Sequence, residues 1–196
     1  MPHRAGLDTR RVVEAAADLI DAEGTDALTL AALAARLGVR IPSLYNHVAG
    51  LDGLHRELAL LAMRGLTEAL GRATMGRSGE PAVFALGNAY RAYAMAHPGV
   101  YSMLQRVPPN TDDETSAAAR APVEVALAVL AGFGLEGEEA IHATRALRSA
   151  LHGFVMLELT GGFGLAVSID ESFSRLLGLL TRGLRDTQAD RQRSRT

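Results

Sequence analysis

The chain has 196 residues, 48% of them hydrophobic, and a formal net charge of −2 at pH 7. That much apolar material supports a packed core and excludes a mainly disordered chain. The lack of cysteine excludes disulfide bonds and thiolate metal sites. No apolar run reaches the ~18 residues needed to cross a bilayer, and Arg10, Arg11 and Glu14 stand where a signal peptide would be apolar. We therefore expect a cytoplasmic protein, whose net charge gives no support for nucleic-acid binding.

Helices are the expected elements throughout, because Ala and Leu dominate and strand-like alternation is short. The first predicted helix covers residues 9–23, where apolar residues recur at helical spacing. Asp8 or Thr9 can serve as its N-cap, and Gly24 follows as a stop. A second helix of about two turns lies between Thr29 and Gly38. The later predicted helices cover residues 41–48, 51–70, 81–97, 99–106, 116–132, 136–160 and 170–185.

The helices predicted at 30–37 and 41–48 are short and are joined by a turn that contains Gly38, as a helix-turn-helix requires. In such a motif the first helix braces the DNA backbone and the second enters the major groove. Pro42 fits only the first turn of the second helix, where its missing N–H group costs nothing. The spacing therefore predicts a short second helix with one face free for DNA.

The second helix of this motif has few residues that can hold it to a core. Val39, Leu44 and Val48 serve as anchors, which leaves Ile41 and Tyr45 directed outward. Exposed apolar groups of this kind suit thymine methyl groups and sugar edges better than water. The alternative is an ordinary short helix in an all-α bundle, which a lone Tyr-x-His pair would favour but the spacing from Val12 to Leu54 does not.

The segment Leu30-x-x-Leu33-Ala34-x-x-Leu37-Gly38-Val39-x-x-Pro42-Ser43-Leu44-Tyr45-Asn46-His47-Val48 resembles the helix-turn-helix signature of the tetracycline-repressor (TetR) family. The resemblance is specific over about residues 8–60 and rests on helix order elsewhere. It implies that Tyr45 and His47 grip phosphates, that Thr29 is a helix cap at a phosphate, and that bases are read from the start of the second helix. The implied DNA contacts are Thr29, Arg40, Ile41, Pro42, Ser43, Tyr45, Asn46 and His47.

Two positions depart from the family pattern. Leu51 replaces a Lys that contacts the DNA backbone in many members, and Ile41 replaces a polar reader that some members carry. Both changes imply fewer charged contacts and leave the register on DNA open. Arg4, Arg10 and Arg11 are suited to an N-terminal arm that reaches phosphate or the minor groove.

The resemblance implies an all-α regulator with a helix-turn-helix DNA-binding domain at 1–50 and a helical ligand-binding and dimerisation domain at 51–188. The polar, arginine-rich composition that follows predicts a disordered tail at 189–196. The implied function is sequence-specific transcriptional regulation by a repressor that a small apolar effector releases. The expected partners are double-stranded operator DNA, the effector and a second copy of the chain, with no membrane, cofactor or metal. The helix at 51–70 would carry the effector's signal to the DNA-binding domain.

The two long C-terminal helices are the expected dimer interface. The helix at 138–160 carries small residues that permit close approach, and the helix at 170–184 carries an apolar seam at helical spacing. Packing of this seam inside the monomer is the alternative. The predicted interface residues are Ala146, Ala150, Gly153, Phe173, Leu176, Leu177, Leu180 and Leu184.

A ligand pocket is expected among aromatic residues and methionines of the second domain, although such residues more often belong to a core. The candidate pocket residues are Met63, Leu66, Phe84, Tyr90, Tyr93, Tyr101, Met103, Leu127, His152 and Phe154. His152 and Glu158 interrupt an apolar helix. They are either polar anchors for a ligand or a satisfied core histidine and an interface carboxylate, the latter bonded to Arg148 or Arg145.

The sequence gives little support for other classes of function. The histidines lack metal-binding spacing, and the serines lack the context of an activated nucleophile. An all-α enzyme and a structural helical adaptor with a degenerate DNA-binding head remain the two rival interpretations. Sequence-specific retention of DNA in a gel shift would separate the regulator from both rivals.

Overall fold

The computed structural model of the protein describes residues 7–106 and 112–194, and every regular element within these ranges is a helix. The chain divides into two compact units. Residues 1–64 and 97–118 form what we name the head unit, and residues 65–96 and 119–196 form the second unit. The cuts between the units fall after residues 64, 96 and 118, whereas the boundary predicted from the sequence is residue 50.

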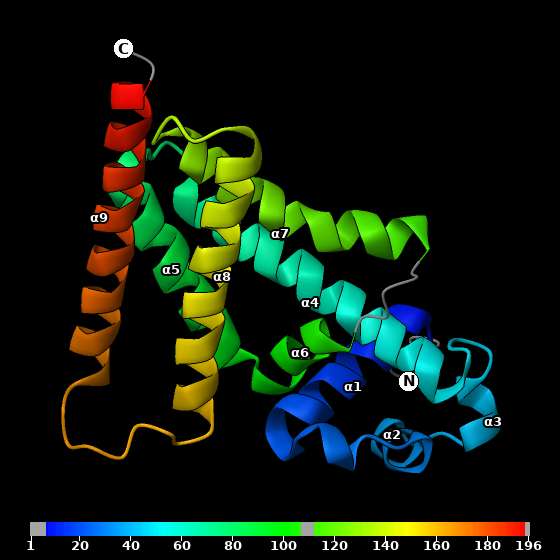
Figure 1. The fold of residues 1–196 in the computed structure, drawn as a ribbon. Coiled ribbons are helices and arrows are strands. Elements are labelled where there is room, and N and C mark those ends of the chain that lie inside the picture. Colours follow the sequence, from blue (N-terminus) through cyan, green and yellow to red (C-terminus); the bar gives the residue numbers. More distant parts are fainter. Residues whose placement is uncertain (1–6, 107–111, 195–196) are drawn as a thin grey trace. The chain divides into compact units, whose positions relative to one another are not determined.

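The head unit is built from short helices and from the first turns of two longer ones (Figure 1). Its elements are α1 (Thr9–Glu23), the 3-10 turn η1 (Thr25–Ala27), α2 (Leu30–Leu37), α3 (Ile41–Leu44), the start of α4 (Gly50–Thr74), α6 (Pro98–Ser102), the 3-10 turn η2 (Met103–Gln105) and the start of α7 (Asp113–Ala131).

Helix α1 begins and ends as its sequence predicts. The side chain of Asp8 accepts a hydrogen bond from the Arg11 backbone N–H at 2.7 Å, which caps the first turn. At the other end the Gly24 N–H donates to the Ile20 carbonyl. The apolar face of α1 is buried against α2 and α6, and Val12 is completely inaccessible to solvent.

Helix α6 is docked on the C-terminal end of α1. The Asp21 carboxylate accepts a hydrogen bond from the Val100 N–H at 2.8 Å, and its second oxygen lies 3.1 Å from Nδ1 of His97. A side chain at Gly99 would collide with the Ile20 carbonyl, so only glycine permits this close approach. The expected helix at 99–106 is thus a short α-helix followed by a 3-10 turn, and both belong to the head unit.

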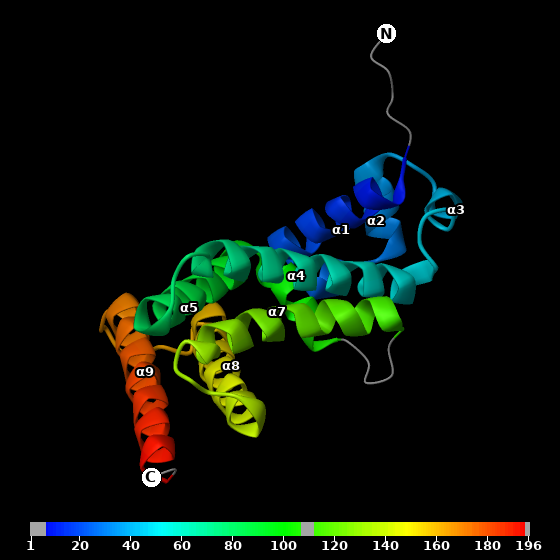
Figure 2. The same cartoon turned by 90° about the horizontal axis from the view of Figure 1, so that it is seen from above.

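The second unit contains the rest of α4 and α7 together with α5 (Gly79–Ala96), α8 (Gly137–Leu159) and α9 (Ile169–Ser194). Helix α5 packs against α8 and α9, which lie side by side and are joined by the loop at 160–168 (Figures 1 and 2). Within the described residues, no helix is long and apolar enough to span a membrane.

Arg91 of α5 connects the three helices of this packing. Its guanidinium forms two hydrogen bonds with Glu158 of α8, at 2.7 and 2.5 Å, and an ion pair with Asp170 of α9 at 2.7 Å. The guanidinium carbon also lies 5.1 Å from the centre of the Phe173 ring. The partner expected for Glu158, Arg145 or Arg148 on the same helix, is therefore wrong, because the carboxylate faces α5.

Two predictions for the C-terminal helix are wrong. Helix α9 extends to Ser194, so most of the expected disordered tail at 189–196 is helical. Phe173, Leu177 and Leu184, expected in a dimer seam, are at most 8% exposed in the single chain and belong to its core. The helical spacing identified an apolar face correctly, but that face is turned toward the chain's own α5 and α8.

Candidate nucleic-acid interface

Helix α2 has a cap at each end that its sequence predicts. The Thr29 hydroxyl accepts a hydrogen bond from the Ala32 N–H at 3.0 Å, so Thr29 is the N-cap. Gly38 ends the helix in the left-handed conformation at φ +66°, and the following Val39 N–H donates to the Ala34 carbonyl. Leu33 and Ala34 are buried in the head core.

Helix α3 is a single turn, shorter than the predicted 41–48. Pro42 occupies its first turn, and the Ser43 N–H donates to the Arg40 carbonyl at 2.9 Å. The helix ends at Leu44, and beyond it the His47 N–H donates to the Leu44 carbonyl at 2.9 Å, a three-residue turn that is tighter than an α-helix. The Val48 N–H donates to the same carbonyl at 3.0 Å. We name residues 45–47 the recognition turn.

The side chains around α3 divide into anchors and an open face. Leu44 is completely buried and Val48 is 6% exposed, so these two anchors lie in the head core as predicted. The third predicted anchor, Val39, is half-buried and packs against that core. Tyr45 is 59% exposed and Ile41 39% exposed. The remaining predicted contacts are exposed at Thr29, Arg40, Pro42 and Asn46 and half-buried at Ser43 and His47.

Much of the positive charge of α1 and α4 is already paired. Arg10 of α1 forms an ion pair with Glu14 at 2.7 Å, which raises the pKa of the Arg10 guanidinium. Arg56 and Arg64 of α4 bind carboxylates at the start of α7, at 2.7–2.8 Å. These ion pairs lower the pKa of the Glu114 carboxyl. Arg4 lies outside the described residues.

The sequence missed one contact of the recognition turn. The Thr9 hydroxyl of α1 donates a hydrogen bond to the His47 carbonyl at 3.2 Å, between residues 38 positions apart. No local pattern indicates this contact, because a threonine directly after an N-cap is compatible with any helix start. The prediction placed Thr9 only as a possible cap, a role that Asp8 fills instead.

The residues expected in the ligand pocket are divided between the two units. Met63, Tyr101 and Met103 belong to the head unit and are at most 3% exposed. Met63 and Met103 lie in the same apolar core as Leu44 and Val12, which assigns them to the packing of the head. The other expected residues, Leu66, Phe84, Tyr90, Tyr93, Leu127, His152 and Phe154, belong to the second unit.

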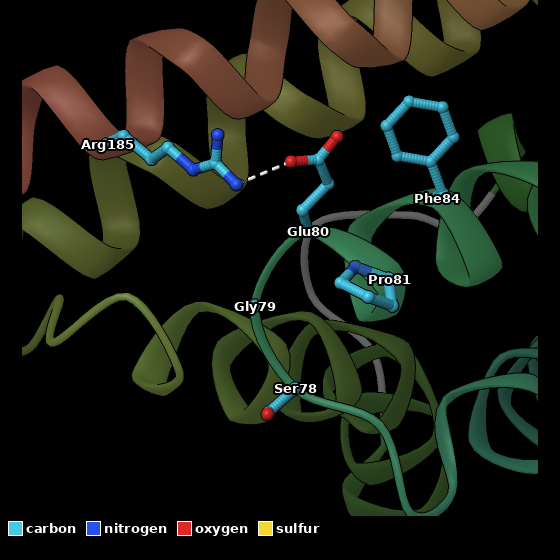
Figure 3. A pocket seen from close by; sticks show the side chains of 6 residues that line it. All are labelled: Ser78, Gly79, Glu80, Pro81, Phe84 and Arg185. Atoms are coloured by element: carbon cyan, nitrogen blue, oxygen red, sulfur yellow. Dashed lines mark hydrogen bonds and ion pairs between the residues drawn. The ribbon is translucent and has the colours of Figure 1, made fainter.

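Phe84 lines an open depression of about 490 Å³ at the start of α5, together with Ser78, Gly79, Glu80, Pro81 and Arg185 (Figure 3). Glu80 and Arg185 form an ion pair at its side. No other residue of the predicted pocket lines this depression. It therefore differs from the apolar pocket that the sequence suggested.

His152 and Phe154 have different surroundings on α8. His152 is half-buried, and burial, reinforced by the charge of Arg148, lowers the pKa of its imidazole. Phe154 packs between Phe163 of the following loop and Phe173 of α9, with ring centres 4.7 and 5.0 Å apart. These ring contacts hold the half-buried Phe154 against the packing of α8 and α9.

Models of known families match both parts of the chain. The model described as bacterial regulatory proteins, tetR family, matches residues 12–57, and the model described as tetracyclin repressor-like, C-terminal domain, matches residues 83–180. The first match covers α2, α3 and the recognition turn. The resemblance that the sequence suggested is thereby confirmed.

Similar proteins agree with this assignment. An uncharacterized HTH-type transcriptional regulator of Mycobacterium tuberculosis, Rv0681, is 44% identical over 80% of this chain and 72% of its own length. A second, YobS of Bacillus subtilis, is 37% identical over 94% of this chain and 96% of its own. A solved protein of unknown function from Rhodococcus sp. RHA1 matches with a TM-score of 0.81 and 23% identity, covering 94% and 99% of the two chains.

The chain belongs to the TetR family of bacterial transcriptional regulators. It is accordingly a DNA-binding regulator with an N-terminal helix-turn-helix and a C-terminal helical region.

Proposed function

We propose that the protein represses transcription as a homodimer in the cytoplasm, by placing α3 and the recognition turn of each copy in successive major grooves of an operator. The DNA contacts would be those predicted from the sequence, Thr29, Arg40, Ile41, Pro42, Ser43, Tyr45, Asn46 and His47. Tyr45, His47 and the cap at Thr29 would grip phosphates, and the residues from Arg40 to Ser43 would face base edges.

One observation carries this proposal. The surface of α3 and the recognition turn exposes Tyr45 and Ile41, while the anchors Leu44 and Val48 fill the head core beneath. A solvated helix gains nothing from exposing apolar side chains of this size, whereas a DNA groove covers them. Because several arginines of α1 and α4 already bind carboxylates of the chain, we expect a modest salt dependence of operator affinity.

Binding-site selection from a random duplex library tests the DNA-binding function without knowledge of the operator. The full chain should enrich a two-fold symmetric sequence with half-sites about one helical turn apart, ~10 bp, or a multiple of it. The enriched duplex should then bind more tightly than a scrambled duplex in a gel shift. Failure to enrich any sequence, with the protein folded, would overturn the proposal.

The proposed dimer interface uses the faces of α8 and α9 that the single chain leaves open. Ala146 and Gly153 of α8 are candidates on the first helix: Gly153 is exposed, and no atom lies within 4 Å of a methyl group added there. Leu157 is 49% exposed, and Leu179 of α9 is 60% exposed. Of the predicted interface residues, Ala150, Leu176 and Leu180 are half-buried and can add to this face.

We further propose that a small, largely apolar effector binds within the second unit and weakens operator binding. The predicted residues that support such a site lie on α4, α5, α7 and α8 of this unit, and Tyr93 and His152 would supply its polar groups. A thermal-shift screen of apolar metabolites and drugs tests it. A ligand that raises the melting temperature should also reduce retention of the selected duplex, and one that leaves retention unchanged is not the effector.

A further inference from the structure

One backbone carbonyl of the recognition turn accepts its hydrogen bond from a residue outside the turn. The Leu44 carbonyl accepts from two N–H groups, and the Val48 carbonyl accepts from the Gly50 N–H at 2.9 Å. The chain then enters α4 at Gly50. The carbonyl of His47 lies between these two bonded carbonyls, and it accepts its hydrogen bond from another helix, through the Thr9 hydroxyl at 3.2 Å.

Thr9 is held in place independently of the recognition turn. It is the first residue of α1, directly after the N-cap Asp8, whose carbonyl accepts from the Val12 N–H at 3.1 Å. Val12 and Val13 of the next turn are buried in the core that also contains Val48. The Thr9 hydroxyl is therefore a donor on a fixed support, next to a turn that is mostly exposed.

The other side of the turn lies against the start of α4. A methyl group added at Gly50 would lie 4.0 Å from Cε1 of the Tyr45 ring, so the ring passes beside the first turn of that helix. The recognition turn is thus held by the Leu44 and Val48 anchors below, by α4 beside Tyr45, and by Thr9 at the His47 carbonyl. The Thr9 contact can be removed without a change in the core or in the side chains proposed to contact DNA.

We infer that Thr9 is a positioning residue for operator binding: its hydroxyl fixes the backbone of His47, and so orients Tyr45 and His47 toward the phosphates. This inference rests on the proposed DNA contacts of those two side chains. Without the hydrogen bond the turn gains conformations, and operator binding must then order it at a cost in affinity. Each half-site would lose up to the net free energy of one hydrogen bond.

Thr9→Val and Thr9→Ser test the inference, because valine matches the shape of threonine without the hydroxyl and serine restores the donor. With the full chain and the selected duplex, Thr9→Val should weaken binding roughly tenfold, the scale of one missing hydrogen bond per subunit. The slope of log K against log salt should stay that of the wild type, because a lost hydrogen bond to phosphate releases no counterions. Thr9→Ser should bind as the wild type does.

A matched control removes a hydrogen bond of the same kind elsewhere. Thr74→Val deletes the bond from the Thr74 hydroxyl to the Leu70 carbonyl, 2.9 Å long, at the far end of α4. It should leave both affinity and salt dependence unchanged. Equal losses of affinity in Thr74→Val and Thr9→Val would mean that removing such a bond acts through general stability, and would overturn the inference.

A double-mutant cycle separates positioning from direct contact. In a Tyr45→Ala/His47→Ala background the Thr9→Val change should have no further effect on affinity, because the side chains that Thr9 orients are gone. An additive loss would mean that Thr9 itself touches DNA and would overturn the positioning role. If the wild type binds the selected duplex but Thr9→Val binds it equally well, this inference fails alone; if the wild type selects no duplex, the proposed function fails first.

Discussion

Arg40 and Tyr45 lie on the same exposed segment, but their chemistry assigns them different tasks on DNA. Arginine forms bidentate hydrogen bonds with guanine, whereas a tyrosine hydroxyl and ring serve any phosphate and sugar. We predict that Tyr45→Ala weakens binding to selected and scrambled duplexes alike. Arg40→Ala should instead cost about 1–3 kcal/mol on the selected duplex and relax the preference at one or two base positions.

Competition binding with single-base variants of the selected duplex measures both effects. Asp26→Ala, an exposed change in the turn between α1 and α2, provides a control that should leave affinity and specificity intact. The same pattern of binding in Tyr45→Ala and Arg40→Ala would show that our division between phosphate grip and base reading is wrong.

The surroundings of His152 lead to a prediction of how the free energy of unfolding depends on pH. Because burial and Arg148 lower the pKa of His152, the unfolded chain takes up its proton more readily than the folded one. The stabilisation from neutral His152 is therefore complete above the unfolded value, ~6.5, and is lost as the pH falls through the lower folded value. His152→Gln should flatten the fall in unfolding free energy between about pH 7.5 and 5.

Urea unfolding across that pH range checks the prediction. His142→Gln, which changes an exposed histidine of the same helix, should keep the wild-type pH dependence. Part of the pH dependence of the unfolding free energy should remain in His152→Gln, because burial and Arg106 also lower the pKa of His55. If the unfolding free energy of His152→Gln falls with pH as steeply as that of the wild type, His152 does not contribute to the pH dependence.

At the scale of elements, the contact between α1 and α6 depends on a single glycine. The docking brings the backbone of Gly99 so close to Ile20 that a β-carbon has no room. Gly99→Ala must shift α6 away from α1, and we expect it to destabilise folding by about 1–3 kcal/mol. Gly71→Ala in α4, where no atom lies within 4 Å of the added methyl group, should be neutral or stabilise by up to ~1 kcal/mol.

Denaturant unfolding of the two alanine variants measures this contrast. It is informative because alanine favours helix formation over glycine in both helices, so propensity alone predicts a gain at each position. Equal gains in the two variants would mean that α6 does not pack against α1 as described.

The Arg91 cluster holds α5, α8 and α9 together, and its parts should not act independently. Glu158 is only 10% exposed, so Arg91→Met would leave a largely buried carboxylate without its partner. We expect a loss of about 2–4 kcal/mol in unfolding free energy. The double variant Arg91→Met/Glu158→Leu should recover most of it, because no charge then remains buried. Additive losses in the same unfolding measurement would show that the pair is not coupled.

The elements that the sequence predicted well are those with local signals. Asp8, Thr29, Gly38 and Pro42 each define a helix end by their own backbone preferences, so the starts of α1, α2 and α3 and the end of α2 could be placed from the sequence. The partner of Glu158 could not be predicted, since Arg91 lies 67 positions away and no local rule relates the two. The hydrogen bond from Thr9 to His47 was missed for the same reason.

At the scale of the whole molecule, the sequence identified apolar helix faces but not what covers them. Helix α9 has Phe173, Leu177 and Leu184 on one face, and helical spacing is the same whether that face meets another copy or the chain's own α5. The prediction of the pocket residues met the same difficulty. Tyr101 and Met103 follow α5 in the chain, but α6 and η2 belong to the head unit.

The dimer proposal yields the last prediction. Leu179 is 60% exposed on α9 and lines an open depression with Gly178, Arg175 and Arg182. Leu179→Arg would add a third positive charge to this face and bury it against the partner copy, so dimerisation should weaken by tenfold or more. Met75→Arg, a change at a 78% exposed methionine outside α8 and α9, should leave dimerisation unchanged.

Sedimentation equilibrium measures dimerisation, and the selected duplex reports the consequence for DNA. Two heads bind an operator more tightly than one because the second contact is intramolecular, so Leu179→Arg should also lose operator affinity at low protein concentration. Raising the concentration should restore binding, since the head itself is unchanged. A monomeric wild type would contradict the proposed dimer. A Leu179→Arg variant that dimerises as tightly as the wild type would instead place the interface on another face.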